Sequence, residues 1–208
     1  MELYLITGFL GAGKTTFLKN FARQFAGRRL RLIINEFGRA GVDGTLLREL
    51  DAALDEISNG SIFCACRLDQ FEAALEQAAA DAPDVVLVEA SGLADPTNVR
   101  RVLAQFPAVS YQGSVCVADA ARLEKVFSTA RACPRQLAVS SLVLLNKTDL
   151  ATEAQCAEAK ALILRANPAA RIRRTQFGRF EPEWLSLIVP DVDVDEVLDM
   201  PDITLQKA

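Results

Sequence analysis

The chain has 208 residues, of which 50% are apolar, and a formal net charge of −4. This length and apolar content allow one domain with a large core. The net negative charge excludes a broad basic surface of the kind that binds nucleic acid. The absence of histidine excludes the commonest general base and metal ligand. No apolar run approaches the roughly 20 residues that span a bilayer, and the first residues do not resemble a signal peptide. We therefore expect a cytoplasmic protein without a nucleic-acid or membrane partner.

The first predicted element is a strand over residues 3–7, and the glycine-rich segment 8–16 follows it directly. This segment fits the P-loop pattern G-x-x-x-x-G-K-[ST], in which backbone N–H groups surround phosphate oxygens. Lys14 is predicted to reach the β- and γ-phosphates, and the Thr15 hydroxyl to bind Mg²⁺. The predicted phosphate-binding residues are Gly8, Gly11, Ala12, Gly13, Lys14, Thr15 and Thr16. The alternative is a glycine-rich turn that binds no ligand.

The next elements follow from the spacing of apolar residues. Phe17, Phe21 and Phe25 recur at helical spacing, which predicts a helix from Lys14 that is closed by Gly27. Further on, the patterns predict a strand over 30–34, a polar loop over 35–43, a weakly patterned helix over 45–54, a turn over 58–60 and a helix over 68–78.

Three unbroken apolar runs come next, and each leads into a polar residue. They cover residues 85–88, 115–118 and 142–145, and the polar residues that follow them are Glu89, Asp119 and Asn146. Buried parallel strands deliver polar residues to the carboxyl edge of a sheet in this way. The remaining predicted elements are a helix over 152–166 with a capping box of Thr152 and Gln155, a strand over 170–175 and a short helix around Trp184.

The alternation of strands and helices predicts an α/β fold of the P-loop NTPase type, with three α/β/α layers and a mostly parallel sheet. We expect the domain to cover residues 1–180, and residues 181–208 to form a short helix and an extended tail. The ligand should lie where the strand ends face the P-loop.

The residues after the third apolar run, Asn146 to Asp149, form the pattern N-K-x-D. The Asp149 carboxylate can accept hydrogen bonds from both N1–H and the N2 amino group of guanine, while Asn146 helps to hold the base edge and the loop. Lys147 belongs to the same predicted nucleotide-binding set. Adenine lacks this pair of donors, so the pattern predicts GTP rather than ATP. The alternative is a polar turn at the end of a strand.

Acidic residues supply the candidates for catalysis and for Mg²⁺. Glu89 at a strand end would hold the ion or a metal-bound water, and Gly92 would bring its N–H to the γ-phosphate; alternatively, Glu89 caps the next helix. Asp43 and Glu36 are candidates for a second metal contact or for orienting the attacking water, or else are solvated loop acids. The candidate catalytic residues are therefore Lys14, Asp43 and Glu89, and the candidate Mg²⁺ ligands are Thr15, Glu89 and Asp43.

Several of these motifs occur together in one order. They are residues 8–16, 35–38 with 41–43, 58–60, 89–96, 145–150 and 167–169. With them the chain resembles the CobW-type GTPases, relatives of the nickel-insertion GTPases for hydrogenase and urease, over roughly residues 3–178. The resemblance implies a GTPase domain that couples GTP hydrolysis to metal delivery, or to maturation of a metal- or cobalamin-dependent enzyme. It also implies a client metalloenzyme or cofactor-maturation protein as partner, and often a homodimer.

The cysteines after the turn at 58–60 depart from that family's pattern. The family usually carries C-x-C-C there, whereas this chain has Ser61 and Phe63 at two of the expected thiol positions and retains Cys64 and Cys66. Two thiolates do not complete a tetrahedral site, but the same pair from a two-fold partner would supply four sulfur ligands for Zn²⁺ or another soft metal. The alternative is that one thiol is buried and the other has no role.

Three functions are compatible with these motifs. The favoured one is a Mg²⁺-dependent GTPase of slow turnover that acts as a metallochaperone or a maturation switch. The second is a non-hydrolysing, nucleotide-gated activator module for a corrinoid or other metalloenzyme, which the altered cysteine motif favours. A small-molecule P-loop kinase is disfavoured because it leaves residues 146–149 without a role.

Overall fold

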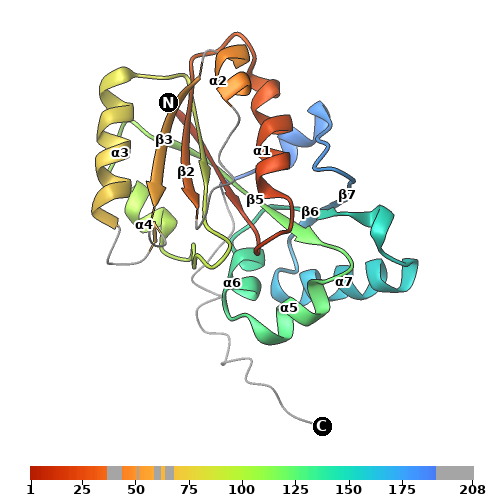
Figure 1. The fold of residues 1–208 in the computed structure, drawn as a ribbon. Helices are drawn as coiled ribbons and strands as arrows, with labels where there is room; N and C mark the ends of the chain where they lie inside the picture. The colour runs from red at the N-terminus through yellow and green to blue at the C-terminus, as the bar shows by residue number, and fades with distance from the viewer. Residues whose placement is uncertain (37–43, 51, 59–61, 64–67, 191–208) are drawn as a thin grey trace.

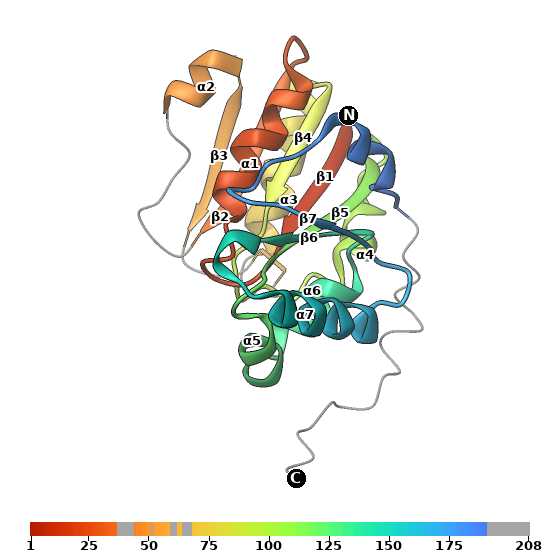
Figure 2. The same ribbon diagram turned by 90° about the vertical axis from the view of Figure 1, so that its right-hand side faces the viewer.

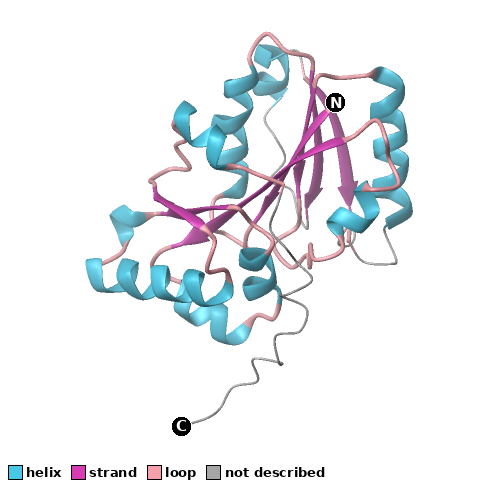
Figure 3. Cartoon of the chain, turned by 180° about the vertical axis from the view of Figure 1, so that it is seen from behind, coloured by secondary structure: helices cyan, strands magenta, loops and turns pink. Residues whose placement is uncertain are grey.

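The structure, a computed structural model, describes residues 1–36, 44–50, 52–58, 62–63 and 68–190. A central sheet lies between helices on both of its faces (Figure 1, Figure 2). Seen from behind, the strands form one continuous twisted layer in the middle of the molecule (Figure 3). Within the described residues, no helix has the length and apolar character needed to cross a membrane.

The sheet has seven strands in the order β3-β2-β4-β1-β5-β6-β7, and every strand pairing in the described part of the chain is parallel. The strands are β1 (Glu2–Thr7), β2 (Leu30–Glu36), β3 (Ala53–Ser58), β4 (Val85–Glu89), β5 (Ser110–Asp119), β6 (Leu142–Asn146) and β7 (Arg171–Arg174). In the centre, Ile6 of β1 pairs with Glu89 of β4, and Thr7 pairs with Cys116 of β5. This register brings the segments that follow β1, β4, β5 and β6 to one edge of the sheet.

The helices connect the strands as expected for parallel pairing. They are α1 (Lys14–Ala22), α2 (Gly44–Leu50), α3 (Leu68–Asp81), α4 (Val99–Leu103), α5 (Leu123–Thr129), α6 (Ala132–Ala138) and α7 (Glu153–Ala166), with 3-10 turns η1 (Arg23–Phe25), η2 (Thr148–Leu150) and η3 (Pro182–Leu187). The predicted capping box of α7 is confirmed: Thr152 and Gln155 exchange side-chain and backbone hydrogen bonds.

Alternate residues of the inner strands face opposite helix layers. In β4, Val85 and Leu87 belong to the core cluster that contains the phenylalanines of α1, whereas Val86 and Val88 belong to the cluster of α3 and α4. A third cluster joins β5 and β6 to α5, α6 and α7. Strands that are covered on both faces need apolar residues at every position, which explains the unbroken runs and confirms the predicted three-layer fold.

One predicted element is wrong. The helix expected over 45–54 ends at Leu50, and Ala53–Ser58 forms strand β3 at the edge of the sheet. This segment has few β-branched residues, so its local pattern does not indicate a strand; pairing with β2 along its full length supplies the missing stabilisation. The predicted short helix around Trp184 is present as η3, and the predicted tail at 191–208 lies outside the described residues.

Candidate functional site

The helix α1 begins at Lys14, within the P-loop segment 8–16, and its N-cap residue is Gly13. Gly13 has a φ of +105°, and a Cβ atom there would lie 2.5 Å from the amide nitrogen of Asn146, so this position requires glycine. Glycine also has no side chain that could cap the first turn. The N–H groups at the start of α1 therefore suit an anion such as a phosphate.

The first turn of α1 lies against the end of β4. The Thr15 hydroxyl donates a hydrogen bond of 3.1 Å to Oε1 of Glu89, a residue that is only 3% exposed. Lys14 is buried as well, and its Nζ donates to the carbonyl of Phe9 in the P-loop at 3.5 Å. The pairing of β1 with β4 thus brings a hydroxyl, a carboxylate and an ammonium group to the phosphate-binding loop.

The segment after β4, residues 90–94, also contacts the P-loop. A Cβ atom on Gly92 would lie 2.6 Å from the backbone nitrogen of Leu10, so the backbone approaches at a distance that only glycine permits. The buried side chain of Gln136 in α6 donates to the carbonyls of Gly92 at 3.2 Å and Ala94 at 2.9 Å. The segment after β4 is therefore packed between the P-loop and α6.

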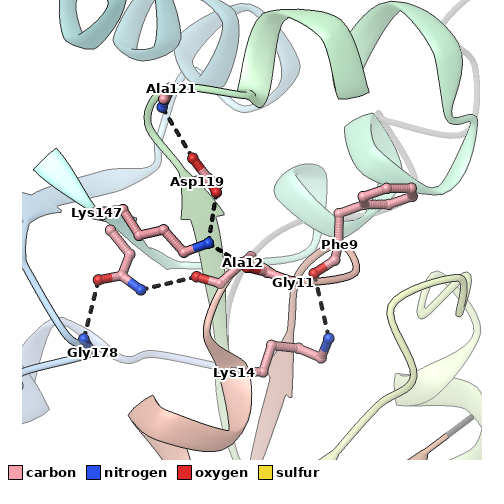
Figure 4. Close-up of polar contacts among 9 residues, drawn as sticks. Phe9, Gly11, Ala12, Lys14, Asp119, Ala121, Lys147 and Gly178 are labelled. Carbon is pink, nitrogen blue, oxygen red and sulfur yellow. Dashed lines mark hydrogen bonds and ion pairs between the residues drawn. The ribbon is translucent and has the colours of Figure 1, made fainter. Parts of the chain in front are cut away.

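Two residues of the N-K-x-D segment are hydrogen-bonded to the P-loop (Figure 4). Nδ2 of the buried Asn146 donates to the carbonyl of Ala12 at 2.9 Å, and Nζ of Lys147 donates to the carbonyl of Gly11 at 2.6 Å and to Oδ2 of Asp119 at 2.8 Å. Asp149 is exposed, within the turn η2. These contacts join the phosphate-binding and N-K-x-D segments into one site with an accessible carboxylate beside it.

A cavity of about 20 Å³ lies behind the P-loop and is lined in part by Leu10, Cys116, Cys133 and Gln136. It is large enough for about one water molecule and too small for a nucleotide base. Burial raises the pKa of Cys133 to about 12 and also raises that of Cys116. Both thiols therefore stay protonated at neutral pH, and both belong to the core cluster of β5, β6 and the helices that cover them.

Several predicted site residues lie outside the described residues. They include Asp43, Cys64 and Cys66, and Glu36 is described only as the end of β2. Within the described residues there is no group of three or more histidine, cysteine, aspartate or glutamate side chains that could hold a metal ion. The second Mg²⁺ contact and the cysteine metal site therefore stay predictions.

Sequence reasoning missed some of the residues that assemble the site. Asp119 was expected at a strand end without a role, and it holds Lys147 in place. Gln136 belongs to no motif, although it fixes the segment after β4. The backbone N–H of Gly178, which donates to Oδ1 of Asn146 at 3.1 Å, lies 32 residues away along the chain and has no local signal.

Known proteins share both the sequence and the fold. The chain is 32% identical to the zinc chaperone CobW of Pseudomonas aeruginosa over 206 residues, which covers 82% of this chain and 55% of that protein. It is 29% identical to the zinc chaperone YjiA of Escherichia coli, covering 73% of this chain and 50% of that protein. The chain thus spans about half the length of these curated relatives.

Solved structures agree on the fold. The Zn(II)-bound YjiA GTPase from E. coli superposes with a TM-score of 0.66 at 23% identity, covering 91% of this chain and 61% of that one. The hydrogenase maturation factor HypB from Archaeoglobus fulgidus gives a TM-score of 0.59 at 21% identity, covering 89% and 87%. The family model for the CobW/HypB/UreG nucleotide-binding domain matches residues 2–174. The chain therefore belongs to the CobW/HypB/UreG family, through its nucleotide-binding domain.

Proposed function

We propose that this chain binds GTP together with Mg²⁺, hydrolyses the GTP, and serves as the nucleotide switch of a metallochaperone for a client metalloprotein. The main support for this proposal is that the P-loop, the Thr15–Glu89 pair and the N-K-x-D segment lie together at one edge of the sheet. A phosphate cradle, oxygen ligands for a divalent ion and a base-recognition segment are the parts that GTP hydrolysis by a P-loop protein requires.

The donor atoms of Thr15 and Glu89 fit Mg²⁺, which prefers hydroxyl, carboxylate, phosphate and water oxygens. The position of Glu89 supports this assignment, because its carboxylate lies at the end of β4 and accepts from the Thr15 hydroxyl in the first turn of α1. Thr15 and Glu89 would hold the ion, with Asp43 as a further candidate ligand. When bound, Mg²⁺ neutralises negative charge on the phosphates.

Lys14 and Gly92 have separate proposed roles around the γ-phosphate. The ammonium group of Lys14 supplies positive charge where negative charge develops during phosphoryl transfer. The backbone N–H of Gly92 would donate to the γ-phosphate, because the Gly92 backbone lies against Leu10 of the P-loop. The segment after β4 would then adopt different positions with GTP and with GDP, which is the basis of a switch.

The proposed cargo is a soft divalent metal ion such as Zn²⁺. The curated relatives in the comparison are named zinc chaperones, and Cys64 and Cys66 provide thiolate chemistry suited to such an ion. Two chains would have to contribute their cysteine pairs to give four sulfur ligands. We therefore propose a homodimer in the cytoplasm that delivers metal to a metalloenzyme or to a cofactor-maturation protein.

Calorimetric titration with GTP and ATP, combined with an assay of phosphate release, tests this function. We expect tighter binding of GTP than of ATP, and phosphate release that requires Mg²⁺ and falls by about a hundredfold in Glu89→Gln. The matched control is Glu153→Gln, since Glu153 is a surface residue paired with Arg174. Equal affinity for the two nucleotides would contradict the proposal, and GTP binding without hydrolysis would favour the activator module instead.

A further inference from the structure

Phe177 is an exposed aromatic residue beside the N-K-x-D segment. The residue is 65% exposed, and it is the one aromatic residue among the large exposed hydrophobic residues of the described part of the chain. Its φ is +54°, in the left-handed region that bulky residues rarely adopt. Such a conformation persists only where surrounding contacts enforce it, and it often marks a functional site.

Helix α1 and Asn146 fix the backbone at and after Phe177. Nδ2 of Asn20 donates to the carbonyls of Phe177 at 3.1 Å and Gly178 at 2.9 Å. The N–H of Gly178 donates to Oδ1 of Asn146 at 3.1 Å, as Figure 4 shows. The backbone of Gly178 also packs against Phe17 in α1, where a Cβ atom would lie 2.7 Å from the Phe17 nitrogen. This side of the segment is therefore held against α1.

Thr148 fixes the other end of the same segment. Its backbone N–H and its hydroxyl donate to the carbonyl of Thr175, at 3.3 Å and 3.1 Å. The Thr175 hydroxyl in turn donates to the carbonyl of Arg179 at 2.8 Å. Residues 175–178 are thus tied at both ends to the segment that contains Asn146, Thr148 and Asp149, and Phe177 lies between the two attachments.

We propose that the ring of Phe177 packs on the face of the nucleotide base whose edge Asp149 recognises, an inference that rests on the proposed function. The hydrogen bonds that a guanine base donates to Asp149 lie in the plane of the base and leave both of its faces uncovered. Stacking on an aromatic ring covers one face, and it stabilises any base because every base has a π-face. Phe177 therefore adds affinity, while Asp149 selects guanine. Phe177 lies outside residues 2–174, the part that the family model matches.

Titrations of GDP and of inorganic tripolyphosphate test this proposal, because tripolyphosphate carries no base. Phe177→Ala should weaken GDP binding by about tenfold and leave tripolyphosphate binding unchanged. Phe177→Tyr should restore most of the GDP affinity, because it retains an aromatic ring. The control is Leu164→Ala in α7, which removes another exposed hydrophobic side chain and should change neither titration.

Unchanged GDP affinity in Phe177→Ala would overturn the proposal. An equal loss of GDP and tripolyphosphate affinity would also overturn it, since that result indicates a displaced segment rather than a lost base contact. If the wild-type chain shows no preference for guanine nucleotides, the proposed function fails separately. Base stacking would then stand only if Phe177→Ala weakened ATP binding and spared tripolyphosphate, and would be overturned if ATP binding were unaffected.

Discussion

The hydroxyl of Thr15 in the first turn of α1 donates a hydrogen bond of 3.1 Å to the buried carboxylate of Glu89 at the end of β4. The two residues are 74 positions apart along the chain, and the pairing of β1 with β4 brings them together. Thr15 belongs to the phosphate-binding loop, and Glu89 ends the strand that leads into the segment that contacts Leu10 through Gly92. A divalent ion at this pair would therefore connect the nucleotide to the segment after β4.

Thr15→Val should remove the stimulation of nucleotide binding by Mg²⁺. The substitution keeps the branched shape of the side chain but deletes the hydroxyl that is proposed to hold the ion. We expect GDP affinity with Mg²⁺ to fall by about tenfold, and affinity in the presence of EDTA to change little. Titration calorimetry under both conditions measures the difference. Thr129→Val, at an exposed position of α5, is the matched control, and an equal loss in both conditions would argue against a metal role for Thr15.

Gln136→Glu should destabilise the protein and alter its discrimination between GTP and GDP. The wild-type amide donates to the carbonyls of Gly92 and Ala94, whereas a carboxylate has no hydrogen to donate and would repel both oxygens. We expect a loss of about 2 kcal/mol in the free energy of unfolding. Urea denaturation measures this loss, and titration of both nucleotides measures the discrimination.

The matched control for that variant is Gln112→Glu, because Gln112 is a partly exposed residue of β5 whose side-chain amide donates to Ser110, two residues away. Its free energy of unfolding should change by no more than about 0.5 kcal/mol. Wild-type stability in Gln136→Glu would show that the amide contacts do not hold the segment after β4.

Arg31→Ala should cost about 2 kcal/mol of unfolding free energy. The guanidinium side chain is 7% exposed, donates to both oxygens of Asp55 in β3, and also pairs with Asp81 in α3. The hydrogen bonds that Arg31 donates to these carboxylates raise the pKa of Arg31, and the bond to Asp55 is the largest cause. Removing it leaves Asp55 without its cation and weakens the edge strand.

Arg29→Ala is the comparison for Arg31→Ala, because the side chain of Arg29 is 68% exposed in its pair with Asp84. A surface pair contributes little, so the change should stay within about 1 kcal/mol. Urea denaturation of both variants provides the measurement. Equal losses of unfolding free energy in the two variants would show that the buried Arg31–Asp55 pair contributes no more to stability than the surface Arg29–Asp84 pair.

Stability should fall at alkaline pH because of the buried thiols. Burial raises the pKa of Cys133 from 9.0 to about 12, so the folded state disfavours the thiolate. The unfolded chain releases this proton at lower pH than the folded chain does; the contribution is therefore complete below pH 9 and is lost as the pH rises toward 12. Cys133→Ala should lose less stability than wild type over this interval in urea denaturation. If the free energy of unfolding fell equally with pH in the variant and the wild type, Cys133 would not be the cause of the loss.

The sequence predicted those parts of the site that depend on local patterns. Glu89 and Asn146 each follow an unbroken apolar run, and the glycines and Lys14 form a contiguous motif. The strand β3 was missed because its stabilisation comes from pairing with β2 rather than from its own pattern. The contacts of Gln136 with Gly92 depend on how α6 packs in three dimensions, and no spacing in the sequence encodes that approach.

The central claim, that Asp149 selects guanine in a site built on the P-loop, is tested most directly by Asp149→Asn with GTP and XTP as ligands. The carboxylate would accept from the N1–H and N2 amino groups of guanine, whereas an asparagine amide can donate to the oxygen that xanthine carries at C2. In calorimetric titrations we predict that the variant loses about a hundredfold in GTP affinity and gains affinity for XTP. A variant that binds GTP as tightly as the wild type, and XTP no better, would contradict the account.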